Sequence, residues 1–141
     1  MKRLIFFNDT GFPYAAIAAA ARSGTLPVHR PPEPQELARV LARTGMGRGD
    51  ATVYHLGDSG EGESCLALWS QGNGDMVRRA IKSFLAIMCI DNYELVQIKC
   101  RKTFGVKVGT WLAAIPGFRK TGMLLIHRHV VNIYRELVSG G

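Results

Sequence analysis

The sequence lacks a hydrophobic run long enough to cross a bilayer, which takes roughly 18 to 20 apolar residues in a helix. The run from Phe84 to Ile90 has seven residues. The run from Leu112 to Phe118 is interrupted by Pro116. These short runs exclude a membrane-spanning segment, and we expect no membrane partner.

Cysteine is also scarce. Cys65, Cys89 and Cys100 are odd in number and far apart in the sequence, which is not the pattern of a disulfide framework. Near the N-terminus, the apolar run after Arg3 ends before Asn8, and it is shorter than the roughly 7 to 15 residues of a signal-peptide core. We therefore expect a cytoplasmic protein with reduced thiols.

The remaining composition is that of an ordinary globular protein, with 141 residues, of which 47% are hydrophobic and 21% are charged. This length is typical of one domain, and it is sufficient for a core that needs no disulfide or metal ion. The chain contains no internal repeat. We therefore predict a single domain over residues 1–141.

Acidic residues are depleted in the second half of the chain. Residues 1–74 contain seven basic and seven acidic residues, whereas residues 75–141 contain eleven basic and four acidic ones, so the net charge of +7 comes from the second half. Such an excess either attracts nucleic acid, nucleotides or acidic partners, or forms a solvated face that keeps the protein soluble. We define a candidate basic surface by five of these residues: Arg78, Lys99, Arg101, Lys102 and Lys107.

Short apolar runs alternate with segments of helical periodicity along the chain. Five apolar runs predict strands, at Lys2 to Phe7, Thr52 to Leu56, Ser64 to Trp69, Tyr93 to Lys99 and Met123 to Ile126. Five segments predict helices, at Tyr14 to Arg22, Gln35 to Thr44, Met76 to Met88, Val106 to Ile115 and Val130 to Val138. The glycine-rich stretch between the second and third runs predicts a hairpin.

This order of elements predicts the α/β class, because short, nearly all-apolar strands that alternate with helices form sheets covered on both faces. We expect a three-layer domain with a mostly parallel, Rossmann-like sheet of about five strands. One of these strands is the antiparallel strand of the hairpin.

The loop after the first predicted strand is a candidate anion-binding site made of Asn8, Asp9, Thr10 and Gly11. Ligands of open α/β sheets bind beyond the carboxyl ends of the strands, and the N-terminus of the next helix offers backbone N–H groups to an anion. The loop has neither the Lys of a nucleotide-binding P-loop nor the Cys and Arg of a low-molecular-weight phosphatase. We predict either an anion site at these four residues or an ordinary connection.

The other polar residues assign no further chemistry. The spacing of His127 and His129 puts both rings on one side only if the segment is extended. No further ligand is near them in the sequence, so we assign no metal. The spacing supports no Ser-His-Asp arrangement and no pair of carboxylates. Catalytic residues and cofactors are therefore left unassigned.

Several segments together carry a family resemblance: the first strand and the alanine-rich helix, Gly24 to Pro27, Leu56 to Asp58, Arg79-Ala80, Val108 to Leu112 and Gly122 to Val138. With these segments the chain resembles a small bacterial family labelled domain of unknown function 3189. The resemblance implies an α/β fold and a bacterial cytoplasm, and it implies no reaction. The first loop of that family is rich in His, Cys, Gly and Ser. Gly11 matches this pattern, whereas the His, Cys and Ser positions fall on Phe7, Asn8, Pro13, Tyr14 and Ala15, which implies that an activity centred on this loop is lost or altered here.

Three functions follow from these observations. The leading hypothesis is a non-catalytic binding or regulatory module for a protein partner or a phosphate-bearing ligand. The first alternative is an enzyme that handles phosphate or nucleotides, with Asn8, Thr10 and the amides near Gly11 on the phosphate and Asp9 or Asp58 acting on a metal ion or water. The second alternative is nonspecific nucleic-acid binding, with an affinity that falls steeply with salt.

Overall fold

The structure, a computed structural model, describes residues 2–10, 12–44, 53–70, 74–98, 104–115 and 117–139. Its elements follow one another in the order β1 (Lys2–Asn8), α1 (Tyr14–Arg22), α2 (Pro34–Thr44), β2 (Tyr54–Asp58), β3 (Glu63–Trp69), α3 (Gly74–Ile87), β4 (Tyr93–Gln97), α4 (Phe104–Ala113) and α5 (Arg119–Ser139). The predicted α/β class is confirmed.

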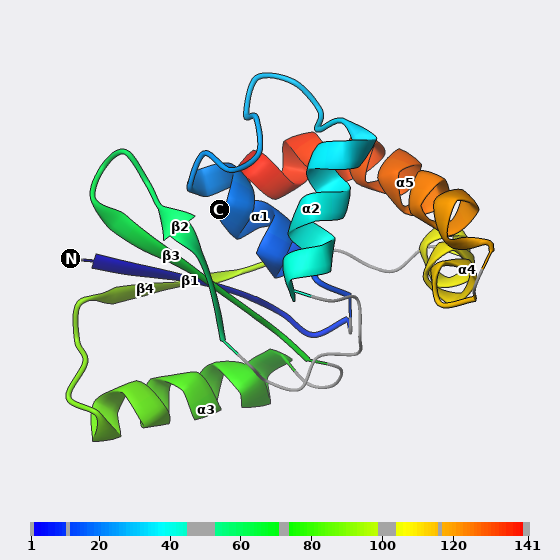
Figure 1. Ribbon diagram of the computed structural model, residues 1–141. Coiled ribbons are helices and arrows are strands. Elements are labelled where there is room, and N and C mark those ends of the chain that lie inside the picture. Colours follow the sequence, from blue (N-terminus) through cyan, green and yellow to red (C-terminus); the bar gives the residue numbers. More distant parts are fainter. Residues whose placement is uncertain are drawn as a thin grey trace.

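The strands form one mixed sheet in the order β2-β3-β1-β4 (Figure 1). β1 is parallel to both of its neighbours, and Ile5 lies opposite Leu66 of β3 and Leu95 of β4. β2 is antiparallel to β3. The mostly parallel sheet with an antiparallel hairpin strand is therefore confirmed, although the described residues form four strands rather than about five.

The segment from Met123 to Ile126 is part of helix α5, so its prediction as a strand was wrong. From the end of this segment onward, the buried side chains of α5 recur every three or four residues, at Ile126, Val130, Tyr134 and Leu137. This spacing places them on one face of a helix. A run of four apolar residues fits either element, and here no turn residue separates it from the helical pattern that continues after it.

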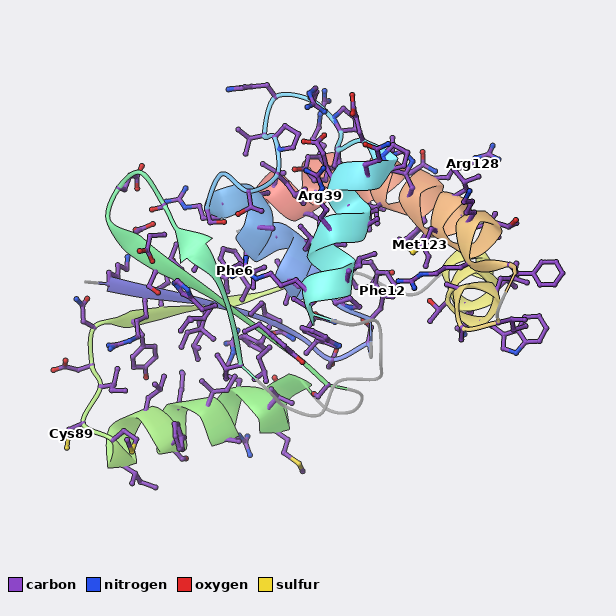
Figure 2. All side chains as sticks on the ribbon, viewed as in Figure 1. Phe6, Phe12, Arg39, Cys89, Met123 and Arg128 are labelled. Carbon is purple, nitrogen blue, oxygen red and sulfur yellow. The ribbon has the colours of Figure 1, made fainter. Side chains whose placement is uncertain are left out.

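One face of the sheet is covered by α1, and α2 and α5 pack against α1 (Figure 1). All residues of α1 from Tyr14 to Ala21 are buried, and six of these eight are alanines, whose short side chains let the helix lie close to the strands. Figure 2 shows Phe6 and Phe12 on this side of the sheet. The Tyr134 hydroxyl of α5 donates a hydrogen bond to the carbonyl of Pro27, and burial raises the pKa of Tyr134 to about 12. This hydroxyl is therefore protonated at physiological pH.

The opposite face of the sheet is covered by α3 (Figure 1). The buried residues of α3 are Gly74 and Leu85. Large apolar side chains of the same helix are exposed, with Met76 at 68% and Phe84 at 61%. The expected helix layers on both faces are thus present, but the α3 layer is thinner and buries less.

Helices α4 and α5 pack closely on each other at two glycines. A Cβ atom on Gly122 would lie 2.4 Å from the Gly109 carbonyl oxygen and 2.4 Å from the Ala113 nitrogen. Both contacts are with backbone atoms, which cannot rotate away, so glycine is required at this crossing. No helix in the described part of the chain combines the length and the apolar character that a membrane span needs.

Candidate functional site

The carboxyl ends of β1 and β3 form the place where a ligand is expected in this topology. The chain leaves β1 toward α1 on one face of the sheet, and it leaves the adjacent strand β3 toward α3 on the other face (Figure 1). Ligands of open α/β sheets bind in the crevice where neighbouring connections diverge in this way. This edge includes the loop that the sequence singled out.

Asn8 holds this loop together on the α1 side. Its buried amide nitrogen donates to the Thr10 hydroxyl at 3.0 Å and to the Phe12 carbonyl at 2.7 Å. Its Oδ1 accepts the backbone N–H of Ala15 at 2.9 Å. This last bond satisfies one of the N–H groups at the start of α1. The Asn8 side chain therefore occupies an N–H group that was predicted to bind an anion.

Asp9 faces α3, because successive side chains of a strand point to opposite faces. Its Oδ2 accepts the backbone N–H of Gly74, the first residue of α3, at 3.0 Å. A Cβ atom on Gly74 would lie 2.8 Å from Asp9 Oδ2 and 2.7 Å from Gln97 Nε2. Asp9 therefore caps α3 from another element, and glycine at position 74 permits the close approach.

Arg78 lies one turn into α3 and packs against the same end of the sheet. Its guanidinium carbon is 5.7 Å from the centre of the Phe7 ring, and its Nη2 donates to Gln97 Oε1 at 3.4 Å. Its Nε is buried and has no hydrogen-bond partner among the described residues, and the same is true of Ser70 Oγ. Ser70 donates its backbone N–H to the Asn8 carbonyl at 3.1 Å, so it follows β3 directly beside the end of β1. We call Asp9, Ser70, Arg78 and Gln97 the carboxyl-edge site.

The structure places some of the predicted site residues and leaves others outside its description. Asn8, Asp9 and Thr10 lie together at the carboxyl edge. Arg78 is on α3 and the exposed Lys107 is on α4, and Figure 1 shows these two helices well apart. The structure therefore does not bring these two members of the candidate basic surface together. The other predicted residues lie outside the described residues: Gly11, Lys99, Arg101 and Lys102.

The two histidines considered as metal ligands lie on helix α5 and have separate partners. His127 Nε2 is 2.7 Å from the Pro32 carbonyl oxygen, and His129 Nε2 is 2.9 Å from the Tyr14 hydroxyl. Burial lowers the pKa of His129. Within the described ranges, no group of three or more His, Cys, Asp or Glu side chains is arranged to hold a metal ion.

Asp58 lies at the opposite edge of the sheet from Asp9. It pairs with Ser64 near the start of β3, whereas Asp9 follows the end of β1. A strand of this length spans roughly 20 Å. Of the two alternative carboxylates, Asp9 therefore lies at the carboxyl ends of the parallel strands and Asp58 does not.

A separate cleft of about 450 Å³ opens between α1, the end of α5 and the sheet. Its charged rim is internally paired, because Arg22 bonds Glu63 at 3.0 Å and Lys2 bonds Glu94 at 2.8 Å. The bond with Lys2 lowers the pKa of Glu94. These rim charges are already satisfied, in contrast to the buried donors of Ser70 and Arg78.

Sequence reasoning missed Ser70, Gln97 and the role of Gly74. A usable signal was present, since Ser70 is followed by a short segment with glycine at 72 and 74 that leads into a helix. Strand, glycine-containing loop and helix is the order in which backbone N–H groups meet a ligand at a sheet edge. The position of Gln97 depends on the pairing of β1 with β4, which sequence alone does not reveal.

The comparison with known protein families agrees with the resemblance read from the sequence. No curated protein and no solved structure matches the chain. The family described as protein of unknown function (DUF3189) matches residues 3–140, which is nearly the whole chain. The chain therefore belongs to the DUF3189 family of proteins of unknown function.

Proposed function

We propose that this protein is a binding or regulatory module that holds a phosphorylated small molecule at the carboxyl-edge site. The observation that supports the proposal is the Arg78 guanidinium, whose buried Nε has no partner among the described residues. A buried donor without an acceptor is unfavourable, and a guanidinium presents several N–H groups in a plane that matches phosphate oxygens. A phosphate at this place gains a charge-assisted contact and relieves the unsatisfied donor.

Two neighbouring groups define the rest of the ligand. The Ser70 hydroxyl is a second buried group without a partner in the described structure, and it supplies one more donor to a phosphate oxygen. Asp9 uses Oδ2 for the Gly74 N–H, and a carboxylate accepts more than one hydrogen bond. The site therefore favours a ligand that carries hydroxyl or amino donors beside its phosphate, as nucleotides and sugar phosphates do.

An enzyme that handles phosphate is the second candidate, and Asp9 is the observation that favours it. A carboxylate beside phosphate-binding groups is the ligand arrangement that Mg²⁺ uses. This reading predicts turnover of a bound nucleotide that depends on Mg²⁺, and the binding-module proposal predicts binding without turnover.

The test is isothermal titration of inorganic phosphate, adenosine mono-, di- and triphosphate, glucose 6-phosphate and unphosphorylated adenosine at low salt. We expect binding of at least one phosphorylated probe and none of adenosine. Arg78→Gln should weaken that binding about tenfold or more, because a charged hydrogen bond is lost. Arg79→Gln is the matched control, since it removes the same charge from an exposed neighbour in the same helix.

The outcomes separate the candidates. Equal affinity of wild type and Arg78→Gln, or no binding of any phosphorylated probe at millimolar concentration, would overturn the proposed site. Phosphate release that requires Mg²⁺ would favour the enzyme. Binding of a mixed-sequence oligonucleotide that falls steeply with salt would favour nucleic acid instead.

A further inference from the structure

A groove of about 760 Å³ lies between the beginning of α2 and the beginning of α5. Its lining includes Pro34 and Ala38 of α2 and Arg119, Lys120, Met123 and Leu124 of α5. Figure 2 shows Met123 near the side of α5 that faces α2. The groove belongs to different elements from the carboxyl-edge site, so an inference about it is independent of the proposed function.

The floor and walls of this groove are apolar and open to solvent. Leu124 is 58% exposed, and Ala38 and Met123 are partly exposed beside it. Contiguous exposed apolar surface with a polar rim is characteristic of protein interaction sites. The groove therefore has the character of a docking surface rather than of a solvated helix face.

The rim of the groove carries positive charge without local compensation. Arg119 and Lys120 are exposed, and neither takes part in an ion pair among the described residues. The sequence contains eight Lys and Arg and no Asp or Glu between residues 95 and 135. On the α2 side, Glu36 is held by Arg30 at 2.9 Å, and this contact lowers the pKa of Glu36. A partner that covers the groove therefore meets a cationic rim.

We propose that this groove binds a short amphipathic acidic segment of a partner protein. Apolar side chains of the segment pack between Ala38 and Leu124, and adjacent Asp or Glu side chains reach Arg119 and Lys120. Helix-lined apolar grooves bind such segments through a few spaced anchor side chains. A second copy of this chain is disfavoured, because it would bring another net charge of +7.

The test is a selection of random linear peptides displayed on phage, using wild-type protein for capture and Leu124→Glu for counter-selection. We expect the enriched peptides to combine Asp or Glu with spaced Leu, Ile, Phe or Met residues. Fluorescence anisotropy of these peptides should show about tenfold weaker binding to Leu124→Glu and to the double variant Arg119→Gln/Lys120→Gln. Binding should persist in Arg78→Gln, which separates this proposal from the carboxyl-edge site.

Matched controls on α3 make the result specific to the groove. Ile87→Glu introduces a carboxylate at another exposed apolar position, and Arg79→Gln/Lys82→Gln removes two exposed positive charges. Neither control should change peptide affinity. The proposal is overturned if no peptide is enriched, if the enriched peptides are neutral or basic, or if the groove variants bind as well as the controls. Two further results would also overturn the proposal if Leu124→Glu abolished them. Self-association in sedimentation would assign the groove to a second copy of the chain, and binding to phosphatidylglycerol vesicles would assign it to a lipid surface.

Discussion

On one face of the sheet every residue of α1 from Tyr14 to Ala21 is buried, whereas on the other face α3 buries Gly74 and Leu85 and exposes Met76 and Phe84. The two helices lie on opposite faces of one sheet, and they differ in how much apolar area they remove from water. Because the hydrophobic contribution to stability follows that area, we expect α1 to contribute more to the free energy of unfolding than α3. Helix α3 is held to the sheet by hydrogen bonds near its N-terminus, where the carboxyl-edge site lies.

The last residue of β1 and the residue after it connect the two faces. Asn8 caps α1 through the Ala15 N–H, and Asp9 caps α3 through the Gly74 N–H. The alternation of side chains along a strand makes this division possible, since neighbouring residues point to opposite sides of the sheet. The end of β1 therefore sets the start of both helix layers and the position of the site between them.

The largest expected difference between the faces comes from one substitution made on each. Phe12→Ala removes a fully buried ring that contacts Tyr14, and should lower the free energy of unfolding by about 3 to 5 kcal/mol. Phe84→Ala removes a ring that is 61% exposed, and should change the free energy of unfolding by less than about 0.5 kcal/mol. Urea unfolding followed by circular dichroism measures both values. Equal losses for the two variants would show that α3 is covered in solution and that the faces do not differ.

A smaller difference is expected from the two residues at the end of β1. Asn8→Ala removes three hydrogen bonds around a buried amide, and should cost about 3 kcal/mol at about 1 kcal/mol per bond. Asp9→Ala removes one capping bond to α3, and should cost about 1 kcal/mol. The same urea experiment tests the order. A larger loss for Asp9→Ala would contradict the assignment of stability to the α1 face.

Most of the fold could be predicted from sequence, because the residues that give the strands and helices their apolar patterns are the residues that form the core. The alternation of short apolar runs with helical segments located β1, β3 and α1 within one or two residues of their observed bounds. The failure at Met123 to Ile126 has a physical cause, since four apolar residues fit either element when nothing bounds them. The face that each helix covers depends on packing between distant segments, which periodicity does not specify.

The candidate site could be predicted only in part. The loop after β1 was identified because its position in an α/β sheet follows from strand order alone. The polar residues that converge there from β3, α3 and β4 are 60 to 90 positions away from Asn8 in the sequence, and only the pairing of the strands brings them together. Gln97 is an ordinary polar residue with no motif of its own, so nothing in the sequence marks it, whereas Ser70 is marked only by the glycines at 72 and 74 that follow it.

The dependence of stability on pH should also come from the α1 face. Burial lowers the pKa of His129, whose Nε2 is 2.9 Å from the Tyr14 hydroxyl. The unfolded chain then binds a proton at a higher pH than the folded chain, so stability falls as the pH drops below about 6.5 toward the folded pKa. Wild type should lose more free energy of unfolding between pH 7.5 and 5 than His129→Gln, as measured by urea titration at each pH. Substitution of the exposed His29 by Gln is the control and should leave the loss unchanged.

The smallest expected difference requires no substitution. Backbone amides of α3 near Leu85 should exchange with deuterium through openings of lower free energy than amides of α1 near Ala18, because few buried contacts hold α3. Mass spectrometry of peptides from each helix measures the two rates. A phosphorylated probe bound at the carboxyl-edge site contacts Arg78 of α3, so it should slow exchange in α3 and leave α1 almost unchanged. Equal slowing of exchange in both helices would show either that the ligand binds elsewhere or that the two faces open as one cooperative unit. Either result would contradict the expected difference in stability between the α1 and α3 faces.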